Sequence, residues 1–235
     1  MRSSDPLTFF FNNLSLFESK VIAHLELSFA AVGVAILIAI PLGAWLGHIH
    51  RGSFLAISVS NIGRALPSLA VIAIGIGILG IGFLNTMVAL VILAGPVILT
   101  NTYVAVAEVD PDAVQAARAM GMTPLVVLWR VELPLAMPLI FAGVRTATVY
   151  VVATATLATF AGGGGLGDII VNEPTYGTAG VIAGSLMITV LAFAVDGLLA
   201  IVQNRITPYP LRKQGRQAKV EPLANAAAWQ APGNR

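Results

Sequence analysis

Five long apolar segments, separated by short polar ones, dominate the pattern of hydrophobic and polar residues along the chain. A helix that crosses the hydrocarbon core of a bilayer needs about 20 consecutive, mostly apolar residues. Each segment is long enough, so the pattern predicts an all-α, polytopic membrane protein. Its five predicted spans cover residues 25–47, 54–80, 86–106, 135–160 and 178–203. Pro41 is expected to kink the first span, and Gly95-Pro96 to break the third.

The same pattern divides the chain into three parts. Residues 1–20 form a polar, Phe-rich lead-in, residues 21–206 form the transmembrane domain, and the Pro-, Gln- and Ala-rich tail at 207–235 is expected to be disordered. Two interpretations of the lead-in remain open. It is either a loosely held terminus or an amphipathic segment lying on the membrane surface through its phenylalanines, which are Phe9, Phe10, Phe11 and Phe17.

Composition supports a membrane protein and excludes several kinds of site. Hydrophobic residues make up 57% of the 235 residues and charged residues 10%, with a mean hydropathy of +0.87. Soluble domains are nearer ~25% charged. The sequence contains no cysteine, which excludes disulfides, thiolate metal sites and cysteine nucleophiles. We also find no Ser/His/Asp set or HExxH motif, so the sequence does not indicate an enzyme.

The segment from 108 to 134 is the longest internal stretch that does not have the pattern of a span. Asp110-Pro111 offers a side-chain cap followed by a proline at the first helical position. Gly121 suits the left-handed residue just past a helix end, and Thr123-Pro124 repeats the start signal. We therefore predict two short helices, at about 111–120 and 124–132, with Pro134 closing the second. Asp110 and Asp112 fit helix-start charges better than catalysts.

The distribution of charge predicts the orientation. Five spans place the two termini on opposite sides, and the glycine-rich loop at 161–177 carries no Lys or Arg. One side holds only Arg2 and Lys20, whereas the other holds Arg51, Arg118, Arg130, Arg205, Arg212, Lys213, Arg216, Lys219 and Arg235. By the positive-inside rule, the 108–134 segment and the C-terminus lie in the cytoplasm and the N-terminus lies outside.

The 108–134 segment resembles the EAA loop of bacterial ABC importer permeases. The family pattern is Glu-Ala-Ala, three residues, Gly, nine residues, Ile, one residue and Leu-Pro. The matching positions here are Gln115, Ala116, Ala117, Gly121, Val131, Leu133 and Pro134. Gln115 departs from the usual Glu, and Asp112, one turn earlier, is a candidate substitute for the missing carboxylate. The resemblance implies a type I permease core in which this segment is a coupling helix that docks on a separate ATPase.

Three further stretches, 61–73, 131–149 and 155–170, look like the permeases for osmoprotectants such as glycine betaine, carnitine and choline. The resemblance implies a multi-pass protein of the bacterial inner membrane that pairs with a second copy or a close relative. It also implies two ATPase subunits, which bind the ATP and Mg²⁺, and an extracytoplasmic substrate-binding protein. We expect no cofactor on this chain and no nucleic-acid partner.

Two alternatives remain beside an osmoprotectant permease. One is an ABC permease for another small solute, such as an amino acid or a phosphonate, which only the three stretches argue against. The other is an ion-gradient-driven carrier, which broken spans and buried charges would suit. The absence of an inverted repeat and the full EAA spacing argue against that carrier.

Three charged residues lie away from the ends of predicted spans: Arg64, Arg145 and Asp196. Charges in a bilayer normally face a partner or a water-filled cavity. Counted from the cytoplasmic ends of their spans, Arg145 and Asp196 lie at similar depth, so we predict that they pair, with Arg64 as the competing partner. Such a pair either ties spans together or takes part in the transport pathway.

Two other features are expected to be structural. GGGGLG at 162–167 lacks the Lys-Ser/Thr of a phosphate-binding loop, so it is interpreted as a flexible turn on the outer surface. The histidines His24, His48 and His50 lie near the ends of predicted spans and are expected to be interfacial or solvated.

Overall fold

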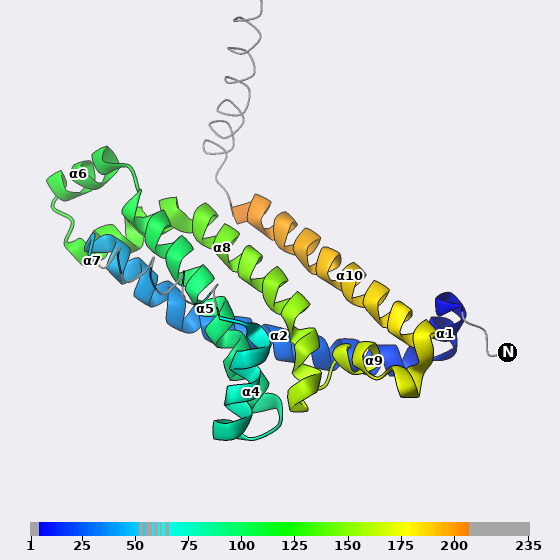
Figure 1. The fold of residues 1–235 in the computed structure, drawn as a ribbon. Helices are drawn as coiled ribbons and strands as arrows, with labels where there is room; N and C mark the ends of the chain where they lie inside the picture. Colours follow the sequence, from blue (N-terminus) through cyan, green and yellow to red (C-terminus); the bar gives the residue numbers. More distant parts are fainter. Residues whose placement is uncertain are drawn as a thin grey trace, which may run out of the picture.

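The computed structural model describes residues 5–51, 54, 58, 61, 63 and 66–206, and all regular structure in that part of the chain is helical. Among these described residues, four segments are long and apolar enough to cross a bilayer. They are α2 (Leu14–His48), α5 (Phe83–Ala107), the segment Pro124–Ala161, and α10 (Glu173–Ile206). Figure 1 shows these segments side by side, with α6 (Pro111–Ala119) at one end of the bundle and α1 (Pro6–Asn12) at the other.

The second predicted span falls partly outside the described residues. The longest described part of this span is α4 (Ser68–Leu79), a helix of 12 residues that packs against α5. The other four predicted spans correspond to the four long segments. The first starts earlier than expected, at Leu14 instead of residue 25, so that α2 has 35 residues.

The third span is not broken at Gly95-Pro96 as expected, because α5 continues through Pro96. α2 likewise remains helical through Pro41, where a kink was predicted. Prolines are tolerated in membrane helices because neighbouring groups satisfy the carbonyls that they free. Pro96 is also packed closely, since a Cβ added at Gly63 would clash with its ring.

Pro134 does not close a helix either. The segment from Pro124 to Ala161 is continuous and consists of α7 (Pro124–Val127), a π-helix η1 (Leu128–Glu132), α8 (Leu133–Thr154) and a 3₁₀-helix η2 (Ala155–Ala161). In η1 the N–H of Leu133 donates to the carbonyl of Leu128, five residues earlier. This wider register directly precedes Pro134, which has no N–H to donate and would clash with a regular preceding turn.

The centre of the bundle is built from apolar residues, half of them alanines, on α2, α5, α8 and η2. Its buried members are mostly alanine and β-branched or leucine side chains; the alanines are Ala31, Ala35, Ala39, Ala94, Ala147, Ala155 and Ala158. Small residues let membrane helices approach closely. At Gly43 of α2, for example, an added Cβ would lie 2.8 Å from the backbone oxygen of Leu99.

The described part of the lead-in packs against the bundle and is not loosely held. The Asp5 side chain caps α1 by accepting a hydrogen bond from the N–H of Leu7. The rings of Phe9 and Phe10 pack edge-on or tilted against Phe17, which is 2% exposed. These rings cover the start of α10 next to Tyr176. Of the four phenylalanines of the lead-in, Phe11 alone is exposed.

The glycine-rich loop is likewise a close-packed turn and not a flexible one. Gly162, Gly164 and Gly165 have positive φ, which side chains rarely adopt. An added Cβ at Gly165 would lie 3.0 Å from His24 Nδ1. The following helix α9 (Gly167–Val171) is held by Asp168, which accepts from Lys20 Nζ at 2.6 Å and from the Thr159 hydroxyl. The glycines therefore allow the chain to fold back between helices.

Candidate functional site

Helix α6 has the start that the sequence predicts. The Asp110 carboxylate accepts a hydrogen bond from the N–H of Asp112 at 2.9 Å, and Pro111 takes the first helical position. Asp112 adds a negative charge in the first turn and Arg118 a positive charge in the last. Both charges favour the helix, because its N-terminus is partially positive and its C-terminus partially negative.

The end of α6 is fixed by Gly121. This residue has φ +82° with nothing within 4 Å of an added Cβ. Its N–H donates to the carbonyl of Arg118, and the N–H of Met122 donates to the carbonyl of Ala117. These two bonds form the Schellman motif, in which a left-handed residue closes a helix. The turn therefore needs a residue that tolerates positive φ, but the space around it is open.

Most of α6 is exposed. It packs against α7 and η1, and Figure 1 shows it standing clear of the membrane-spanning bundle. Ala117 is buried at 2% exposure and faces the protein, whereas Asp112, Gln115 and Ala116 are exposed. The helix thus presents a slim surface with polar side chains on its outer side.

The second helix of the segment attaches α6 to the bundle. Val127 and Leu128 are buried, and Leu128 joins a cluster with Ala44, Val106 and Ala136. Leu125 and Trp129 of the same segment are exposed. At the end of the EAA pattern, Val131 and Leu133 are half-buried and Pro134 is exposed.

An ion pair that sequence reasoning missed lies directly behind this segment. His48 Nδ1 is 2.6 Å from Glu132 Oε2, and both side chains are buried, at 7% and 2% exposure. His48 is therefore not solvated as expected. His24 is also buried, and its Nε2 donates to the carbonyl of Val152 at 2.8 Å, whereas His50 is exposed. The available signal was Glu132 itself, a carboxylate next to an apolar span.

The structure brings Arg145 and Asp196 together, as their matching depth predicts. Arg145 Nε donates to Asp196 Oδ1 at 2.7 Å and Arg145 Nη2 to Oδ2 at 2.6 Å, in a bidentate arrangement. Arg145 Nη1 also donates to Gln203 Oε1 at 3.3 Å. The pair joins α8 to α10. Arg64, the competing partner, lies outside the described residues.

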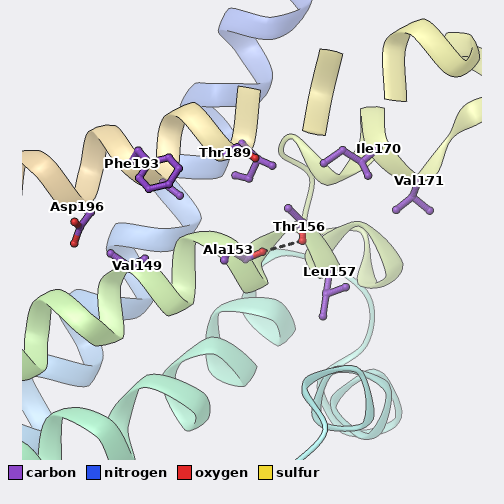
Figure 2. Close-up of a pocket in the computed structure, with 11 residues that line it drawn as sticks. Val149, Ala153, Thr156, Leu157, Ile170, Val171, Thr189, Phe193 and Asp196 are labelled. Carbon is purple, nitrogen blue, oxygen red and sulfur yellow. Dashed lines mark hydrogen bonds between the residues drawn. The ribbon is translucent and has the colours of Figure 1, made fainter. Parts of the chain in front are cut away.

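A mainly apolar pocket extends from this pair along α8 and α10 towards α9 (Figure 2). Its volume is about 620 Å³. Asp196 and Phe193 lie at one end, and Ile170 and Val171 at the other. The pocket supplies space and apolar surface, while its ionised end is already neutralised by the pairing with Arg145.

Comparisons with known proteins agree on one family. The family model described as "Binding-protein-dependent transport system inner membrane component" matches residues 27–208. The choline transport system permease protein OpuBB of Bacillus subtilis is 39% identical over 83% of this chain and 90% of its own length. The glycine betaine/carnitine/choline transport system permease protein OpuCB of the same organism is 38% identical over 88% and 95%.

Among solved structures, a chain of the MetNI methionine ABC transporter in an inward-facing conformation superposes with a TM-score of 0.73. It is 23% identical and is covered over 98% of its length, against 83% of this chain. At this level of identity the match establishes the fold, which is that of an ABC importer permease.

The Arg145–Asp196 pair can be tested by a double-mutant cycle. Asp196→Asn and Arg145→Gln each leave one ionised group in a membrane-spanning segment without its charge partner. We expect each single variant to lower the thermal unfolding midpoint in detergent by several degrees, and the double variant to lower it by less than the sum. Additive effects would show that the pair does not stabilise the protein.

Proposed function

The chain belongs to the family of binding-protein-dependent transport system inner membrane components, and on this premise we propose that it is the permease of an ATP-driven importer for a small quaternary ammonium osmoprotectant, such as choline, glycine betaine or carnitine. The names of its relatives support the choice of solute. The chain acts as a transport subunit, and ATP and Mg²⁺ bind to a separate ATPase.

The exposed, doubly capped helix α6 is the observation that carries the coupling part of the proposal. ATPase subunits that close on ATP must move something in the permease, and α6 is the element that stands clear of the bundle (Figure 1). The exposed surface of α6 at Gln115 and Ala116 is slim enough to enter a groove. The π-helix η1, which attaches α6 to the bundle, continues directly into α8. The remaining partners are a substrate-binding protein outside and a second permease copy or close relative.

Shape contributes more to this docking than charge at position 115. Gln115 keeps the length of the usual glutamate but carries no charge. Asp112 is exposed one turn earlier and supplies a carboxylate on the same helix. Both ends of α6 are fixed by hydrogen bonds before any partner binds, so little conformational entropy is lost on docking.

We place the α6 end of the bundle in the cytoplasm and the N-terminus outside. Arg51, Arg118, Arg130 and Arg205 are the charges that support this, since they flank the ends of helices on the α6 side, whereas Lys20 lies near Asp168 at the opposite end. Basic residues favour the cytoplasmic side of membrane proteins. Alkaline phosphatase, active only after export, should be inactive when fused to the C-terminus and active when fused before Pro6 with an added leader. The reverse pattern would overturn this orientation.

The solute and the energy source are tested together in proteoliposomes. The chain, its ATPase and its binding protein are reconstituted, and uptake of labelled choline, glycine betaine and carnitine is measured with and without ATP, with methionine as the control solute. We expect ATP-dependent uptake of at least one osmoprotectant and none of methionine. Uptake driven by an ion gradient without ATP would contradict the proposal.

Replacing Gly121 tests the coupling turn. Gly121→Val forces a β-branched residue to φ +82°, which costs at least about 1–2 kcal/mol and so reduces the population of the native turn by roughly tenfold. We expect a similar fall in the ATPase activity stimulated by the loaded binding protein. Gly121→Asn, which tolerates a left-handed backbone, is the matched control and should retain most activity. Normal stimulation in the valine variant would count against the coupling role of α6.

A further inference from the structure

The buried pair of His48 and Glu132 lies between two elements that the coupling mechanism must connect. His48 is in the last turn of α2, and Glu132 is the final residue of η1, immediately before α8. Their side-chain atoms are 2.6 Å apart and hidden from solvent. A carboxylate in such surroundings is strongly disfavoured without a partner, so the two elements are held together at this point.

On the α2 side the pair is rigidly mounted. The helix ends in a Schellman motif, because the N–H of Arg51 donates to the carbonyl of Leu46 and the N–H of His50 to that of Gly47. His50 has φ +49°, which is unusual for a residue with a side chain. An added Cβ at Gly47 would lie 2.8 Å from the backbone oxygen of Tyr103. The end of α2 therefore cannot shift easily against α5.

On the other side, Glu132 belongs to the most irregular part of the segment. π-helical turns are rare and frequently occur at functional sites. Leu128, at the start of the turn, is buried against Ala44 of α2 and Val106 of α5. Helix α6 packs against α7 and η1, and η1 in turn contacts α2. Figure 1 shows α7 beside the C-terminal end of α2.

From this arrangement we propose that the His48–Glu132 pair is a positioning contact through which displacement of α6 is transmitted to α2. The proposal rests on the coupling role of α6 described above. Movement of α6 reaches η1 first, because α6 packs against η1 and α7 and stands clear of the spans. The buried pair then forces α2 to follow η1, and α2 carries with it the alanine-rich core that it shares with α5 and α8.

A pair that only stabilised the fold would affect assembly but not the number of solutes moved per ATP. The test therefore measures this ratio in the reconstituted complex, together with co-purification of the subunits. Glu132→Gln removes the charge with little change in shape, His48→Gln removes its partner, and Glu18→Gln, an exposed carboxylate at the other end of α2, is the matched control. We expect both pair variants to hydrolyse ATP but to move at least about fivefold less solute per ATP.

A second readout does not depend on the solute. The chain has no cysteine, so cysteines placed at the exposed residues Leu37 of α2 and Leu198 of α10 can be spin-labelled selectively. ATP should change the distance between the labels in the parent complex, but not in the Glu132→Gln complex. If the parent complex transports no osmoprotectant and still shows this difference, the choice of solute fails while the role of the pair holds.

A final variant is needed in case the single variants do not assemble with the other subunits. In His48→Met/Glu132→Met an apolar pair fills the same space, and such replacements of buried ion pairs often preserve folding. We expect this variant to assemble and to remain uncoupled. Normal transport per ATP in the single variants or in the methionine pair would overturn the proposal. So would a Glu132→Gln complex in which ATP changes the distance between the labels as much as in the parent complex.

Discussion

The structure depends above all on satisfying backbone hydrogen bonds where there is no water. In a bilayer each N–H and C=O must find a partner within its own helix or a neighbour, so α2 and α5 remain helical through Pro41 and Pro96. Departures from α-helical geometry occur at the ends of α8, where η1 precedes it and η2 follows it, and near the start of α10, where Gly177 has φ +67°. The spans are therefore stiff rods, and irregular backbone is concentrated where they join other elements.

Because the membrane-spanning helices are regular, they differ mainly in how tightly they pack against one another. α2, α5 and α8 are joined by an alanine-rich core in which backbones approach closely. α10 is different, since only 6% of its most apolar stretch is buried, against 44% of the corresponding stretch of α2. It is held at one end by the aromatic and aliphatic cluster around Phe17 and Ile169, and further along by the bidentate contact of Asp196 with Arg145. In the described part of the chain, α2, α5 and α8 thus form a tight core to which α10 is attached at two places.

Local rules explain what the sequence could predict. The cap at Asp110 and the left-handed turn at Gly121 depend on neighbouring residues only, and both are present where expected. The Arg145–Asp196 contact followed from depth, because helices rise a constant 1.5 Å per residue. The solvation of His48 was predicted wrongly because its partner, Glu132, is 84 residues away. The packing of the glycine loop could not be predicted from neighbouring residues. It depends on side chains such as His24, which only the folded structure brings against Gly165.

Local rules also bear on Gln115, which stands where the EAA pattern that this segment resembles has glutamate. An isolated helix of nine residues is marginal in water, since nucleation is unfavourable and few bonds offset it. Here the cap at Asp110, the Schellman bonds at Gly121 and the burial of Ala117 define the helix before a partner arrives. A preformed surface loses little entropy on binding. The ionic contact that a carboxylate at position 115 could add is exposed, and exposed ion pairs contribute about 0–1 kcal/mol. For the proposed docking of α6 on the ATPase, the turn at Gly121 therefore matters more than a charge at position 115.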